Sequence, residues 1–146
     1  MARVPYYGIA EAIQTVLQNE PGMEGVLVTV EEDGPMSTEQ MPWVGIYVVD
    51  RVDDGGPISG GTMQRFRVRY QIWCAEHAME SVKDALRLVT DLMSRVELAL
   101  VKNPTANLNV ASLRIQRGTF DRAQGEGGFI MAGSIDLEVI CTASSV

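Results

Sequence analysis

Residues 63–75, MQRFRVRYQIWCA, decide the fold, because apolar and polar side chains alternate along them almost without a break. A period of two is typical of a β-strand that is buried on one face only. The apolar positions are Phe66, Val68, Tyr70, Ile72 and Cys74, and the other face carries Arg65, Arg67, Arg69, Gln71 and Trp73. The stretch therefore predicts a long strand with one core face and one cationic face.

Helical spacing replaces this alternation on the C-terminal side. Between residues 78 and 102 an apolar stripe recurs at intervals of three and four, opposite a charged side, which predicts a long amphipathic helix. Ser81 and Asp84 have the spacing of a capping box, although residues 76–80 could already be helical. The start of this helix is therefore left open by one turn.

The remaining elements follow from the same two periods. Helical spacing predicts a first helix from Ile9 to the Pro21-Gly22 pair, and β-rich runs predict strands over residues 26–30 and 43–49. Loops are predicted over 31–41 and 50–62, and a closing hairpin is predicted from strands 110–120 and 129–142 with a turn region over 121–128. On the last strand, Asp136 and Glu138 are expected to face solvent or a partner.

This order predicts one α+β domain over residues 1–146. It contains an N-terminal helix, three mainly antiparallel strands, a long amphipathic helix packed on the sheet, and a C-terminal β-hairpin. A chain of 146 residues that is 46% hydrophobic can form one sizeable core without metals or disulfides. The net charge of -7 argues against free-standing binding to nucleic acid, because contacts to phosphates need an excess of Lys and Arg on one face. No signal-peptide core or long apolar stretch occurs, so the cytoplasm, or a particle assembled there, is the expected location.

The sequence offers little for catalysis. His77 is the only histidine, and together with Cys74 it supplies only two potential zinc ligands. The second cysteine, Cys141, lies like Cys74 in an apolar alternating run, where a free cysteine usually behaves as a small buried hydrophobe. Two such cysteines indicate a reducing compartment. No nucleophile-elbow, Walker or dinucleotide-binding motif occurs. We therefore expect no enzymatic activity, no catalytic residue, no cofactor and no metal.

Two features are better suited to contacts between proteins. The first is the arginine face, which could simply discourage edge pairing, or could meet carboxylates of a neighbouring subunit. The second is the pair of loops, whose apolar residues would be unneeded in a purely solvated loop. The candidate interface residues are Arg65, Arg67, Arg69, Trp73, Asp53, Asp54, Ile58, Met36 and Met41.

The arrangement resembles the tail terminator proteins of long-tailed bacteriophages. The resemblance is carried by IAEAI at 9–13, PWVGIY at 42–47, FRVRYQIW at 66–73, the long helix and the terminal hairpin. It implies a virion structural protein that forms a homo-oligomeric ring, a hexamer, at the head-proximal end of the tail tube. The implied partners are the major tail tube protein and a head-tail connector or neck protein, with DNA passing through the lumen without sequence-specific binding. Assembly would occur in the host cytoplasm, without a membrane.

Three alternatives stay open. Head-tail connector and tail-completion proteins share this layout, so the chain could belong to the neck. A tail tube subunit would polymerise without limit. A small enzyme or ligand-binding α+β domain would be stabilised by its ligand.

Overall fold

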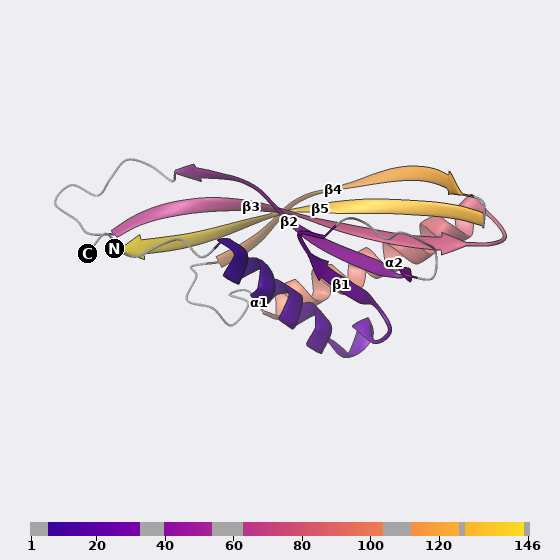
Figure 1. The fold of residues 1–146 in the computed structure, drawn as a ribbon, viewed down its shortest axis with the longest axis horizontal. Coiled ribbons are helices and arrows are strands. Elements are labelled where there is room, and N and C mark those ends of the chain that lie inside the picture. The colour runs from indigo at the N-terminus through magenta and orange to yellow at the C-terminus, as the bar shows by residue number, and fades with distance from the viewer. Residues whose placement is uncertain (1–5, 33–39, 54–62, 104–111, 126–127, 145–146) are drawn as a thin grey trace.

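The computed structural model describes residues 6–32, 40–53, 63–103, 112–125 and 128–144. These residues form one twisted sheet with two α-helices on one side of it, as Figure 1 shows. The elements are α1 (Tyr6–Asn19), the 3-10 helix η1 (Pro21–Met23), β1 (Leu27–Val30), β2 (Trp43–Asp53), β3 (Met63–Ala78), α2 (Val82–Lys102), β4 (Ser112–Gly125) and β5 (Gly128–Ser144). The predicted α+β class and order of elements are confirmed.

The five strands lie in the order β1-β2-β3-β5-β4. β3 is central and pairs antiparallel with β2 and β5, and β4 pairs antiparallel with β5. β1 runs parallel to β2, which requires a longer connection than a hairpin does. The expectation of a mainly antiparallel sheet is therefore confirmed, with β1 as the exception.

Several strands are longer than their composition suggests. β3 pairs with β5 along its whole length of 16 residues. The loop predicted over 50–62 is wrong at its start, because β2 continues to Asp53, and the turn predicted over 121–128 is wrong because β4 continues to Gly125. Residues 50–53 and 121–125 are rich in Asp, Gly and polar residues that commonly form turns, but in the sheet their backbones pair with β3 and β5.

The start of α2 is set by its cap. Ser81 has an extended backbone, and its hydroxyl accepts a hydrogen bond from the Asp84 N–H at 3.1 Å. This satisfies one of the amide groups that a helix leaves unpaired at its N-terminus. The capping alternative is therefore confirmed, and residues 76–78 belong to β3.

Both helices bury their apolar sides against the same face of the sheet. α2 packs on β3 and β5, and α1 packs on β1 and β2. The core between them contains Ile9, Ile13, Leu17, Val44, Ile46, Val68, Tyr70, Ile72, Val89, Leu92, Val96, Ile135 and Leu137. Neither α1 nor α2 is long and apolar enough to cross a bilayer, and these are the α-helices of the described ranges.

Glu31 protects part of the edge of β2 just beyond the end of β1. Its backbone is left-handed, with φ of 54°, and its N–H donates to the Ile46 carbonyl at 2.9 Å. The Glu31 carboxylate then accepts a hydrogen bond from the Val48 N–H at 2.5 Å. Glu31 lies at the start of the loop predicted over 31–41 and is exposed, but its two hydrogen bonds extend the pairing of β1 with β2.

Glu76 is a buried acid between the end of β3 and α2, with 7% of its surface exposed. Burial raises the pKa of its carboxyl, while Arg95 and His77 act in the opposite direction and Asp91 adds to the rise. Because the pKa in the folded state is raised, the folded state binds this proton more tightly than the unfolded state does. The contribution of Glu76 to stability therefore falls as the pH rises from about 4.5 through the raised pKa.

The variant Glu76→Gln removes this ionisation without changing the shape of the side chain. We expect it to melt at a higher temperature than the wild type at pH 7, and the difference to shrink below pH 4.5, where the wild-type carboxyl is protonated in both states. Scanning calorimetry across this range measures the effect. A difference in melting temperature that does not change with pH would contradict it.

Candidate assembly surface

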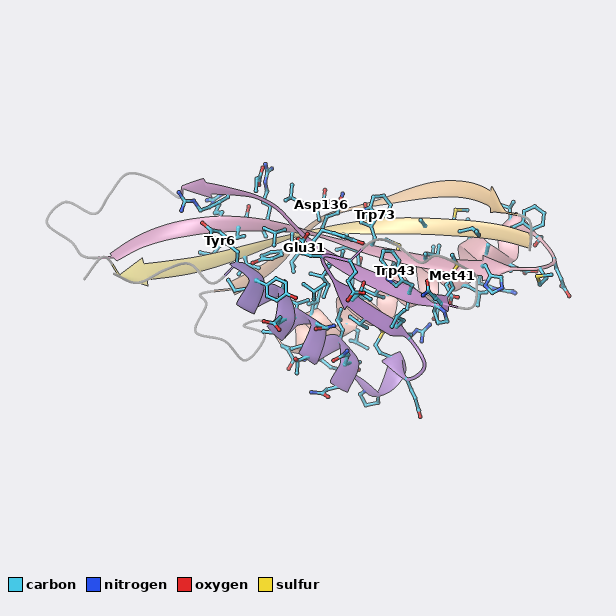
Figure 2. All side chains as sticks on the ribbon, viewed as in Figure 1. Tyr6, Glu31, Met41, Trp43, Trp73 and Asp136 are labelled. Atoms are coloured by element: carbon cyan, nitrogen blue, oxygen red, sulfur yellow. The ribbon has the colours of Figure 1, made fainter. Side chains whose placement is uncertain are left out.

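No described helix covers the sheet face opposite α1 and α2, and we call it the open face. In Figure 2 the labelled side chains of Trp73 and Asp136 project on this side, away from both helices. Strand alternation and register place the following described residues on it: Thr29, Trp43, Gly45, Tyr47, Asp50, Arg67, Arg69, Gln71, Trp73, His77, Ser134, Asp136 and Glu138.

Trp43, Gly45 and Tyr47 form an aromatic cluster at the β2 side of the open face. The Trp43 indole N–H donates to the Thr29 hydroxyl at 3.0 Å, and the ring centroids of Trp43 and Tyr47 are 6.4 Å apart. The Trp43 ring lies over Gly45 so closely that a Cβ at position 45 would be 2.2 Å from its Cζ2 atom. A strand glycine often marks such a close approach, so the pair at positions 43 and 45 was a signal of this cluster that the sequence analysis missed.

A chain of polar contacts crosses the open face from β3 to β5. Trp73 stands opposite Gly45 on β2 and Ser134 on β5. Its indole N–H donates to the Gln71 Oε1 atom at 2.9 Å, and the Gln71 amide donates a long hydrogen bond of 3.4 Å to Asp136. Trp73 is thus a half-buried side chain with a fixed orientation and a partly accessible surface.

Arg69 pairs within its own chain. Its guanidinium makes two hydrogen bonds to the Asp50 carboxylate across the β2–β3 register. These bonds hold the pKa of Asp50 below its usual range and raise the pKa of Arg69, to which the nearby carboxylates of Glu138 and Asp136 add. The expectation of a cationic face is therefore corrected at this position, because carboxylates of the same chain surround the guanidinium.

Glu138 does not behave as expected either. It was expected to face solvent or a partner, and it lies on the open face opposite Arg69, but only 7% of its surface is exposed, so it does not face solvent. Its position on β5, between β3 and β4, surrounds it with neighbouring strands. Asp136, two residues earlier on the same face, is half-buried. The structure therefore brings Arg69, Asp136 and Glu138 together in the middle of the sheet.

The other candidate interface residues are distributed as follows. Arg67 is half-buried on the open face, and Met41 is half-buried just before β2, away from Asp136 in Figure 2. Arg65 lies in β3 and Asp53 ends β2, but their side chains are outside the described part of the structure, and Met36, Asp54 and Ile58 lie outside the described residues altogether.

The cysteine-histidine pair does not converge. Cys74 lies in the core and His77 is three residues further along β3, so the two side chains project to opposite faces of the sheet. Burial, with a smaller effect of Glu97, raises the pKa of the Cys74 thiol to about 12. This thiol is therefore protonated at neutral pH and is a poor nucleophile. Among the described residues, no three acidic, histidine or cysteine side chains are grouped so that they could hold a metal.

Comparison with known proteins gives partial likenesses of fold. No family model matches the sequence, and no curated protein matches it. Among solved structures, the chain is similar to the sheath/tube terminator of an extracellular contractile injection system, PVC, in its extended state, with 11% identity and a TM-score of 0.49. That match covers 89% of this chain but only 54% of the other, so the chain spans about half the length of that terminator. It is also similar to a chain in the virion of a native gene transfer agent particle, with 12% identity, a TM-score of 0.40, and coverage of 94% of this chain and 98% of the other.

Proposed function

We propose that this protein is a virion structural protein of the tail terminator type, which forms a closed homo-oligomeric ring through the open face. The observation that carries the proposal is that one face of a five-stranded sheet lacks a helical cover in the described structure, yet presents ordered aromatic and charged side chains. The element order of the sequence, which resembles that of tail terminators, supports the more specific assignment.

The chemistry of the open face suits a contact between subunits. Trp, Tyr and Arg are enriched in protein interfaces. The open face offers Trp73 and Arg69 on β3, and Tyr47 on β2 pairs with Gln71, the position between them. The side chains of Trp73 and Arg69 are held by hydrogen bonds before any partner arrives, so little side-chain entropy is lost on docking. A contact between this face and a different surface of the next copy is head-to-tail, and such contacts close into rings when the rotation allows it.

In this role the protein would act by association and not by catalysis. A hexameric ring of single-domain subunits would cap the head-proximal end of the tail tube, stop tube polymerisation and present the docking surface for a head-tail connector or neck protein. DNA would pass through the lumen without sequence-specific contacts, and the ring would be assembled in the host cytoplasm and kept in the virion. A protein of the neck that uses the same ring is the alternative within this class.

Tube termination can be tested with purified components. Adding the protein to polymerising tail tube protein from the same particle is expected to shorten the tubes, with the added protein at one end of each tube in electron micrographs. The variant Leu98→Ser, changed at an exposed position of α2 away from the open face, is the control and should terminate tubes as well as the wild type does. Unchanged tube lengths would reject the role of terminator. Incorporation of the added protein along the whole tube would also reject it and would indicate a tube subunit.

A further inference from the structure

Glu31, labelled in Figure 2, stands where β1 ends and β2 continues. β1 pairs with β2 from Trp43 to Ile46, and Glu31 adds one more bond by donating its N–H to the Ile46 carbonyl. In a parallel ladder, a residue that donates in this way would accept, through its own carbonyl, from the N–H two residues further along the partner strand. Here that N–H belongs to Val48, and it donates to the Glu31 carboxylate at 2.5 Å. A side-chain oxygen thus takes the place of a strand carbonyl.

The left-handed backbone of Glu31 accompanies this exchange. With a φ of 54°, the main chain leaves the strand conformation at this residue. Such a backbone costs a non-glycine residue about as much free energy as one exposed hydrogen bond returns. Glu31 is exposed and its bond to Val48 lies at the surface, where water could serve the same N–H. Stability alone therefore does not account for the arrangement, and what the carboxylate keeps away from the edge does.

The edge of β2 is accessible at this point. Val49, the next residue along the strand, has 55% of its surface exposed and lies at a bulge. β2 then continues to Asp53, past the end of β1. An accessible strand edge is a template for pairing with another chain, and proteins close such edges with charged side chains and bulges. Both devices occur here within two residues of Val48.

We infer that the edge of β2 at Val48 is a strand-addition site for a second copy of this chain, and that the Glu31 carboxylate keeps the site closed. A backbone N–H that has lost its acceptor pairs readily with a carbonyl of an extended segment. In a solution of the purified protein, that segment belongs to another copy. The site lies on an edge of the sheet and not on the open face, so the inference does not depend on the proposed ring.

The test uses variants made in the Trp73→Ser protein, called the parent here, so that contacts through the open face do not add to the mass. Glu31→Ala removes the carboxylate that accepts from Val48. Glu31→Gln carries no charge but keeps an oxygen acceptor at the same reach, so it separates the hydrogen bond from the charge. Glu32→Ala is the matched control, because Glu32 accepts from the Tyr47 hydroxyl through its backbone carbonyl and not through its side chain.

We expect Glu31→Ala to associate as its concentration rises. Sedimentation equilibrium at tens of micromolar should give it the mass of two or more subunits, whereas Glu31→Gln and Glu32→Ala should keep the mass of the parent. At dilutions where Glu31→Ala also has the parent's mass, its Val48 amide should exchange hydrogen about tenfold faster than in Glu32→Ala. Protection of this amide should return when Glu31→Ala is concentrated, because a second copy then supplies the acceptor.

Circular dichroism checks that each variant is folded. Glu31→Gly lacks the carboxylate and also relieves the left-handed backbone, so it should associate as Glu31→Ala does even if the alanine variant folds poorly. A folded variant without the carboxylate that keeps the parent's mass at every concentration would overturn the inference.

Three other results would overturn it as well. Unchanged exchange at Val48 in the dilute Glu31→Ala protein would show that Glu31 does not hold this N–H. Association without renewed protection at Val48 would place the contact elsewhere. Equal association of Glu31→Gln or Glu32→Ala would show that charge, and not the hydrogen bond, closes the edge. The ring is judged separately, by the wild-type protein and its open-face variants.

Discussion

Gly45→Ala is expected to lower the free energy of unfolding by about 3 kcal/mol and the melting temperature by roughly 10 °C. Alanine suits a β-strand at least as well as glycine does, so propensity alone predicts no loss. The loss comes from space, because the new Cβ would lie 2.2 Å from Trp43 Cζ2 and 2.9 Å from Tyr47 Cε2. Trp43 cannot simply swing aside, since its indole is bonded to Thr29 and only 5% of its surface is exposed. Chemical and thermal denaturation measure the change.

Gly22→Ala is the matched control for this prediction. Its Cβ would meet the Arg95 side chain at 3.4 Å, an ordinary contact, and we expect a change below about 0.5 kcal/mol. Removing the obstructing ring should couple to the first variant, so that Trp43→Leu and Gly45→Ala together cost less than the sum of the two. A Gly45→Ala protein as stable as the wild type would show that the Trp43 ring does not pack over β2 as described.

Trp73→Ser is expected to weaken each contact of the proposed ring about 30-fold, which corresponds to about 2 kcal/mol per contact. Trp73 is an aromatic residue near the centre of the open face, is held by a hydrogen bond to Gln71 and is partly accessible to a partner. Loss of such an anchor removes most of the apolar contact at the centre of an interface. A closed ring contains one contact per subunit, so the loss of binding free energy is repeated at every contact of the ring. Sedimentation velocity should therefore show mainly monomer at micromolar concentration.

The control for Trp73→Ser is again Leu98→Ser. Leu98 is 51% exposed on α2, on the helical side of the molecule, so its loss removes a comparable exposed apolar group from a different surface. Circular dichroism should show that both variants keep the fold. Assembly that survives Trp73→Ser as well as it survives Leu98→Ser would remove the open face as the specific contact.

The sequence was sufficient wherever periodicity decides the structure. The alternation around Val68 and Arg69 predicted which residues of β3 enter the core, and the spacing of Ser81 and Asp84 predicted one of two possible helix starts. Alternation assigns a face to each residue, since strand geometry leaves no third choice. What it cannot supply is register, and the pair between Asp50 and Arg69 depends on register across two strands.

The errors arose where composition was used in place of pairing. Residues 50–53 are polar enough to predict a loop, yet they extend β2 because β3 continues beside them. Glu138 was predicted to face solvent or a partner because it is charged and on the polar face, but its central place in the sheet buries it from solvent. Both outcomes follow from strand order, which depends on contacts between distant parts of the chain.

The central claim, that the open face assembles this chain into a closed ring, is tested most directly by the mass of the purified protein in native mass spectrometry, with electron micrographs of the same sample. We predict one dominant species of six subunits that appears as a closed ring, and its replacement by monomer in Trp73→Ser. A wild-type protein that remains monomeric at tens of micromolar, or a ring that survives Trp73→Ser unchanged, would contradict the account.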